Sequence, residues 1–175
     1  NVNYILAAKV FYMDYADYSR ESRKKIYEHM SIVKQLKFPS ILRFHDYSTT
    51  GFGNEHRQTV LNSFCKNESL EKNLNNDKFT FTKKMINIFG VASAMNYLHK
   101  HNIFHYDLKT STILEDDFFY PKLSDIGYSK CFQGLKSMAK IKEFSHYIAP
   151  EVLIKDEFTQ KSEVYSFGLI IYEIM

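Results

Sequence analysis

The chain opens with runs of apolar, β-branched and aromatic residues that are short enough to be strands. Residues 2–13 are mostly apolar and carry a single basic charge, Lys9, within the run. Residues 41–47 and 58–65 form two further short runs of the same kind, separated by a turn-like polar segment. Such runs bounded by turn residues predict three strands in the first third of the chain.

A different spacing of apolar residues lies between the first two of these runs. Over residues 21–36 the apolar side chains recur every three or four positions, which is typical of a helix with one buried face. Pro39 follows and closes the segment. The buried face is predicted to consist of Ile26, Met30, Val33 and Leu36.

The remainder of the chain is predicted to be mainly helical. A polar linker, residues 66–78, precedes a helix over residues 82–99, and an almost wholly apolar helix spans residues 163–175. We therefore expect an α+β fold with a strand-rich part, residues 1–65, and a mainly helical part, residues 66–175. The buried face of the first of these helices is predicted from its apolar positions: Met85, Ile88, Phe89, Ala92, Met95 and Leu98.

Composition narrows the class of protein. With 45% apolar residues among 175, the chain can bury a core, and its 23 basic residues are interleaved with 20 acidic ones, which does not indicate nucleic-acid binding. Its two cysteines, Cys65 and Cys131, fit neither a disulfide framework nor a zinc site and favour a reducing, cytoplasmic location. No apolar run reaches the roughly 18 residues of a membrane span.

Several polar motifs follow one another in a fixed order. A strand lysine, Lys9, comes before a helix; "HYDLKTSTIL" begins at His105, "SDIG" at Ser124, "YIAPE" at Tyr147 and "EVYSFG" at Glu163. Each motif alone is weak, but their order and spacing along nearly the whole chain resemble the protein kinases, in particular the tyrosine-kinase-like group.

The resemblance implies a function for four charged residues. Lys9 would contact the α- and β-phosphates of ATP, and Asp125 would hold Mg²⁺. Asp107 would accept or orient the proton of the substrate hydroxyl, and Lys109 would steady the transferring phosphoryl group. Lys109 is similar to the serine/threonine-kinase pattern. Phosphoryl transfer needs such residues because it depends on positioning and on neutralising charge.

The resemblance also implies an adenine site. Ala7 and Leu114 would lie on the two sides of the base, and Asn62 would occupy the gatekeeper position. The hinge segment, whose backbone would bond to adenine, would consist of Ser63, Phe64 and Cys65.

The expected catalytic pattern is broken at several positions. Thr112 stands where kinases carry an asparagine that binds a second Mg²⁺, and a hydroxyl is a shorter and poorer ligand. Tyr106 replaces the arginine before the aspartate, so a phosphate on the activation loop would lack its usual cationic partner. Glu163 replaces an aspartate, and its extra length is expected to displace the backbone that this residue normally holds.

Two further departures concern pairing partners. The glutamate that should pair with Lys9 falls on His29, next to Glu28. Because position 29 lies on the apolar stripe and Glu28 lies about 100° away around the helix, we expect Glu28 to be a solvated charge and His29 to be half-buried. The threonine expected before Ala-Pro-Glu falls on Phe144, with Ser145 as a substitute only if the loop shifts.

The ends of the domain are predicted to be missing. No glycine-rich strand pair precedes Lys9, and residues 51–53, Gly-Phe-Gly, are interpreted as an ordinary turn because they follow the helix. The final helix resembles the central helix of the larger kinase lobe. Because residues 164–175 of this helix carry one charge, Glu173, and little polar surface, we expect the 175 residues alone to leave apolar surface in water and to associate.

The sequence leaves two classes of function open. In the first, the chain is an enzyme that uses ATP and Mg²⁺ to phosphorylate Ser or Thr of a protein, with impaired catalysis. In the second, it is a pseudokinase that binds or regulates a protein partner. A fragment with no function of its own is a third possibility.

Overall fold

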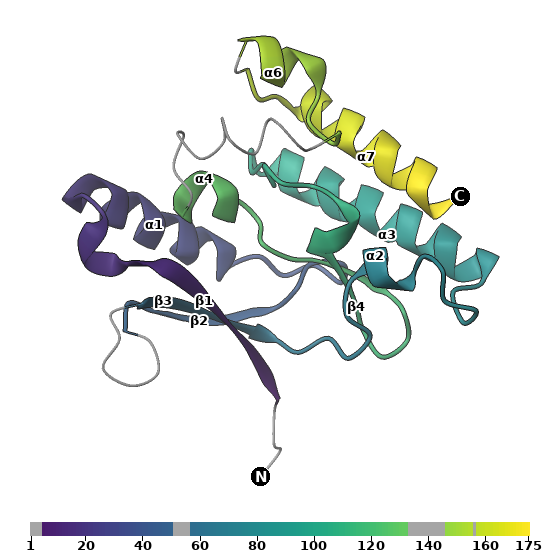
Figure 1. Cartoon of the computed structure of the whole chain (residues 1–175), viewed down its shortest axis with the longest axis horizontal. Helices are drawn as coiled ribbons and strands as arrows, with labels where there is room; N and C mark the ends of the chain where they lie inside the picture. The colour runs from purple at the N-terminus through teal and green to yellow at the C-terminus, as the bar shows by residue number, and fades with distance from the viewer. Residues whose placement is uncertain (1–4, 51–56, 133–145, 156) are drawn as a thin grey trace. The chain divides into compact units, whose positions relative to one another are not determined.

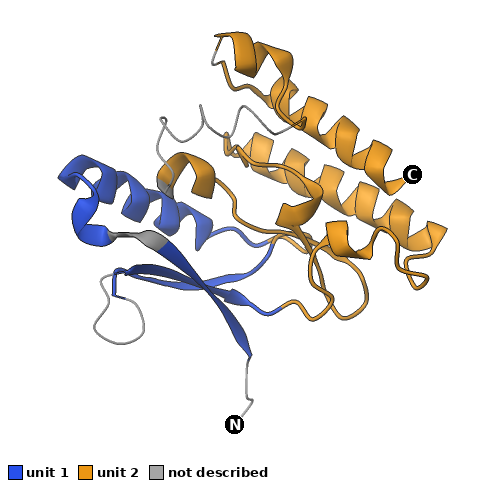
Figure 2. Cartoon of the chain, in the orientation of Figure 1, with its two compact units in different colours: residues 1–37, 42–64 blue, residues 38–41, 65–175 orange. Residues whose placement is uncertain are grey.

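The computed structural model describes residues 5–50, 57–132, 146–155 and 157–175. The chain divides into two compact units, the first made of residues 1–37 and 42–64 and the second of residues 38–41 and 65–175 (Figure 2). The first unit holds an antiparallel sheet and one long helix, and the second is mainly helical. The predicted α+β class, a small sheet unit followed by a helical unit, is confirmed.

The first unit is a three-stranded sheet with a helix inserted in sequence after its first strand. The sheet has the order β1-β3-β2, and both pairings are antiparallel. Residue ranges are as follows: β1 Leu6–Asp14, the 3-10 turn η1 Tyr15–Asp17, α1 Arg20–Val33, β2 Phe44–Ser48 and β3 Arg57–Ser63 (Figure 1).

Helix α1 begins after Ser19, whose side chain caps its first turn. The Ser19 side chain accepts a hydrogen bond from the Ser22 N–H at 3.1 Å, which satisfies one of the free donors of the first turn. Ile26, Met30 and Val33 are buried, as their spacing predicts, whereas Leu36 lies beyond the end of the helix and is half-buried. The predicted helix is therefore confirmed with an earlier end.

The second unit is built around two long helices. Helices α3, Phe81–Lys100, and α7, Gln160–Ile174, run side by side in opposite directions (Figure 1). The shorter elements are α2 Leu70–Asn73, η2 Thr110–Thr112, β4 Ile113–Glu115, β5 Pro121–Leu123, α4 Tyr128–Phe132 and α6 Pro150–Lys155. The hairpin β4–β5 and helix α2 lie in segments for which no element was predicted.

Residues 38–41 belong to the second unit although their neighbours in sequence belong to the first. The Leu123 N–H donates to Ser40 O at 2.8 Å, and Lys122 Nζ donates to Pro39 O at 2.7 Å. The Phe38 ring stacks on Tyr97 of α3 at a centroid distance of 4.9 Å. This short segment thus packs along β5 and α3.

The buried face of α3 differs from the predicted one. Phe89 is 75% exposed and Met85 is 37% exposed, so the prediction that both are buried is wrong. The buried residues are instead a mixed set: Asn87, Gly90, Val91, Ala94, Met95 and Leu98. The small Gly90 faces Pro121 of β5, which turns this side of the helix toward the hairpin. The close approach of the backbone at Gly90 therefore accompanies the buried apolar side chains on this face.

None of the helices in the described part of the chain combines the length and the apolar character needed to cross a membrane.

Candidate functional site

The loop of residues 105–112 carries the two predicted catalytic side chains next to each other. Lys109 Nζ lies 3.0 Å from Asp107 Oδ2, and both side chains are about one-third exposed, at 33% and 29%. The pair is therefore accessible from water while being held in a defined geometry. A carboxylate acceptor and a fixed cation at this distance are the elements that phosphoryl transfer requires.

The backbone at the start of this loop is held by Glu163 of α7. Glu163 Oε1 accepts hydrogen bonds from the N–H groups of His105 and Tyr106 at 2.5 and 2.9 Å. Its Oε2 lies 2.6 Å from His99 Nε2 at the end of α3. Glu163 thus holds this backbone despite its extra length, because one oxygen reaches both N–H groups while the second bonds across to α3.

His105 itself lies in the interior of the second unit. It is fully buried, and burial lowers its pKa, although the carboxylates of Glu163, Asp107 and Asp125 act in the opposite direction. The ring is therefore neutral at neutral pH, which allows its Nδ1 to accept the Asp107 N–H at 3.3 Å. Asp107 is thus positioned by its backbone as well as by Lys109.

Thr112 uses its hydroxyl inside the loop. Its Oγ1 accepts the Lys109 N–H at 3.2 Å and lies 2.9 Å from Asp107 O and 3.0 Å from Lys109 O, to one of which its O–H donates. The side chain is buried. A hydroxyl oxygen has two lone pairs, so at most one remains for any other ligand.

Asp125 lies in a turn that is tied to the same loop. Ser124 N–H donates to Thr112 O at 2.9 Å, and Gly127 N–H donates to His105 O at 3.0 Å. Asp125 has φ 60° and Gly127 has φ 71°, so the turn uses left-handed backbone at both positions. Such a conformation costs about 1–3 kcal/mol at a non-glycine residue and is typical of functional turns.

The second unit offers limited ligands for a metal ion. Among the described residues, no group of three His, Cys, Asp or Glu side chains is placed to hold a metal. Mg²⁺ in nucleotide enzymes is commonly bound by one or two carboxylates together with phosphates and water. The Asp125 carboxylate fits that mode, and the buried, internally bonded Thr112 hydroxyl fits it poorly.

The residues predicted to contact ATP from the strands lie in the first unit. Lys9 is on β1, opposite Val60 of β3, and its Nζ is 6.0 Å from the centroid of the Phe11 ring. Ala7 pairs with Asn62, which is buried at 8% exposure on β3.

The predicted hinge residues differ in environment. His45 Nε2 lies within hydrogen-bonding distance of Ser63 Oγ, at 2.9 Å, and the Phe64 side chain is 53% exposed. Burial raises the pKa of the Cys65 thiol to about 11, so this cysteine is a protonated packing residue. Leu114, on β4 of the second unit, is half-buried.

Glu28 and His29 of α1 differ in their exposure to water. Glu28 is exposed and its carboxylate is 3.8 Å from Lys24 Nζ, one turn earlier, whereas His29 is half-buried. The prediction that Glu28 is a solvated charge is confirmed. Phe144 and Ser145, and the turn at residues 51–53, lie outside the described residues.

A polar cluster that the sequence did not indicate lies behind the loop. Thr110 Oγ1 donates to Glu173 Oε2 at 2.9 Å, and Tyr147 Oη donates to the same oxygen. His146 Nε2 lies 3.1 Å from Glu173 Oε1. The only signal in the sequence is that Glu173 is the one charge within an apolar helical stretch, where a carboxylate needs partners.

The comparisons with known proteins show similarity to protein kinases. The family model described as "Protein kinase domain" matches residues 1–175. "Cold-responsive protein kinase 1" of Arabidopsis thaliana is 27% identical over 169 residues, covering 90% of this chain and 42% of the relative. "Cysteine-rich receptor-like protein kinase 42" of the same plant is 36% identical over 119 residues, covering 65% of the chain and 18% of the relative.

A "Putative serine/threonine-protein kinase" of Helianthus annuus is 34% identical over 126 residues, which is 66% of this chain and 52% of the relative. The chain therefore spans at most about half the length of these three relatives.

Proposed function

Because the chain belongs to the protein kinase domain family, whose sequence model it matches from residue 1 to residue 175, we propose that it binds ATP and slowly phosphorylates Ser or Thr of a protein. The observation that carries this proposal is the Asp107–Lys109 pair, 3.0 Å apart on a loop whose backbone is bonded to Glu163. The ion pair and the hydrogen bonds to Glu163 hold both side chains in a defined position, which lowers the cost of positioning.

In this proposal each residue has one task. Asp107 accepts or orients the proton of the attacking hydroxyl, and the Lys109 ammonium neutralises charge on the transferring phosphoryl group. Lys9 binds the phosphates of ATP, and Asp125, with Thr112 as a weaker candidate, holds Mg²⁺. ATP supplies the phosphoryl group and Mg²⁺ neutralises its phosphates when both are bound. Adenine lies against Ala7, Leu114 and the hinge near Asn62.

The second candidate is a pseudokinase that binds or regulates a protein partner. It is favoured by the Thr112 hydroxyl, which is committed to the loop backbone and replaces a metal-binding asparagine. It is also favoured by His29, a half-buried histidine at the position of the glutamate that pairs with Lys9. Each lost positioning contact costs on the order of tenfold to a thousandfold in rate, so the two together support weak catalysis.

We also propose a kinase group and a cellular location for the protein. Lys109 supports serine/threonine specificity, and the stretches "YLHKHNIFHYDLK" and "FYPKLSDIGYSK" support a tyrosine-kinase-like grouping. Both cysteines are free, and a cytoplasmic location is supported by this usage. The partner is a protein, and the near balance of acidic and basic residues gives no support for nucleic acid.

Nucleotide binding tests the proposal directly. We expect the chain to bind ATP weakly, with tighter binding when Mg²⁺ is present. Lys9→Met should abolish binding in a calorimetric or fluorescent-nucleotide titration, and Asp125→Asn should remove the effect of Mg²⁺. Lys37→Met, at an exposed lysine of the same unit, is the matched control. If Lys9→Met binds ATP as well as the parent does, the assignment of Lys9 is wrong.

A further inference from the structure

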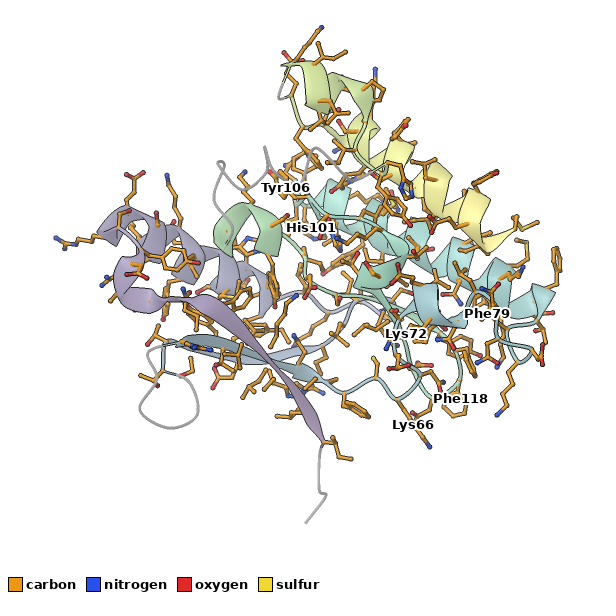
Figure 3. The ribbon with its side chains drawn as sticks, viewed as in Figure 1. Lys66, Lys72, Phe79, His101, Tyr106 and Phe118 are labelled. Carbon is orange, nitrogen blue, oxygen red and sulfur yellow. The ribbon has the colours of Figure 1, made fainter. Side chains whose placement is uncertain are left out.

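Tyr106 makes several contacts that the proposed chemistry does not use. It lies between His105 and Asp107, in the stretch that follows α3 (Figure 3). Its hydroxyl accepts a hydrogen bond from Lys130 Nζ of α4 at 2.7 Å. Helix α4 begins three residues after Asp125, so this bond adds a side-chain link to the backbone bond from the Gly127 N–H to His105 O between the segments that carry the two acidic residues of the site.

The ring of Tyr106 packs against two phenylalanine rings. Its centroid lies 4.6 Å from that of Phe158 and 5.7 Å from that of Phe104. Phe104 and Phe158 also meet edge to face at 6.1 Å. Phe158 immediately precedes Thr159, the N-cap of α7, so three segments far apart in sequence meet on one tyrosine.

The backbone of Tyr106 requires such support. Its φ is 68°, in the left-handed region that a bulky residue adopts only at a cost of about 1–3 kcal/mol. The N–H is held by Glu163 at 2.9 Å, and the side chain is held by the two phenylalanine rings and Lys130. These contacts hold both the backbone and the side chain of Tyr106, the residue next to Asp107.

We propose that Tyr106 and Lys130 form a latch that positions Asp107 without a phosphorylated residue. This inference rests on the proposed function, because it assigns the pair to that site. An arginine at position 106 would place a second cation beside Lys130, and the two would repel each other unless an anion lay between them. A neutral phenol accepts the lysine directly, so the chain closes the link by itself. Tyr106 is thus a positioning residue.

Hydrogen exchange of the backbone N–H groups at residues 105–107, measured by mass spectrometry without nucleotide, tests the latch. Lys130→Met and Tyr106→Phe should each speed exchange by roughly twofold to tenfold, the effect of one net hydrogen bond. The double variant should be no faster than Lys130→Met alone, because Lys130→Met already removes both this bond and the contact of Lys130 Nζ with the Tyr106 ring, 4.6 Å from its centroid. Lys130→Arg, which keeps a donor, should stay near the parent rate.

Lys130 is exposed, so its replacement leaves the core intact, and Lys155→Met on α6 provides a control for loss of an exposed lysine in the same unit. Lys9→Met should leave exchange at residues 105–107 unchanged even where it abolishes ATP binding, which separates a failure of the latch from a failure of the proposed function. Unchanged exchange in either single variant, or additive effects in the double variant, overturns the latch. So does faster exchange in the parent after phosphatase treatment.

Discussion

Thr112 and His29 stand at the two positions where a metal ligand and a lysine partner are expected. Restoring both, as Thr112→Asn with His29→Glu, should raise phosphotransfer far more than either change alone. The two side chains would act on one nucleotide and metal complex, so their effects should be non-additive, on the order of tenfold to a thousandfold for the pair. A radiolabelled-phosphate transfer assay measures this.

Glu28→Gln is the control for these changes, because Glu28 is exposed beside His29 and should leave the rate unchanged. Additive or absent effects of the double variant would speak against a weakened enzyme and favour the pseudokinase.

Individual residues were predicted correctly where the argument was local. The environments of Glu28 and His29 follow from helical geometry alone. The hydrogen bonds of Glu163 were not predicted, because its partners His105 and Tyr106 are more than fifty residues away in sequence. Whether a side chain one methylene longer still reaches its donors depends on how α7 lies against the loop, which no local pattern reports.

At the scale of elements, two helical glycines are expected to respond oppositely to alanine. A Cβ at Gly90 of α3 would lie 2.5 Å from Pro121 Cγ and 3.0 Å from Ser40 Oγ, so Gly90→Ala should destabilise the second unit by about 1–3 kcal/mol. A Cβ at Gly168 of α7 meets nothing within 4 Å among the described atoms, so Gly168→Ala should stabilise by about 0.5–1 kcal/mol. Urea denaturation measures both, and equal signs would contradict the packing of α3 against β5.

Glu115 of β4 makes stability depend on pH. It is fully buried, and burial raises its pKa to about 7, against a smaller opposing effect of the hydrogen bond from Asn87. Because the carboxyl is protonated in the folded unit, its contribution is fully present below the unfolded pKa of about 4.5 and is lost as pH rises through 7. The loss amounts to about 3 kcal/mol.

Glu115→Gln removes this titration while keeping the size of the side chain. We expect the variant to be more stable than the parent at pH 8, by about 1–3 kcal/mol, and to differ little from it at pH 4.5. Chemical denaturation at both pH values measures the difference, and Glu71→Gln, at an exposed position of α2, is the control. A difference between variant and parent that does not change with pH would show that the pKa of Glu115 is not raised in the folded unit.

At the scale of the whole molecule, large apolar side chains remain exposed on both long helices. Phe89 of α3 is 75% exposed, and Val164 and Tyr172 of α7 are 57% and 82% exposed. Exposed groups of this kind favour association. We expect the 175-residue chain to associate, and Phe89→Glu to reduce its mean mass in light scattering.

Thr82→Glu, at an exposed position of the same helix, changes the net charge equally without removing an apolar side chain and should have little effect. A parent chain that is monomeric at all concentrations would contradict the prediction.

The sequence alone determined the class of fold and the family resemblance. Strand and helix periods are local properties, and the motifs around Lys9, Asp107 and Asp125 keep their order whatever the packing. Tertiary structure decided which face of α3 is buried, that residues 38–41 pack on β5, and how Glu163 and Lys130 meet the loop. These depend on distances between residues remote in sequence, and such distances exist only once helices and strands have packed.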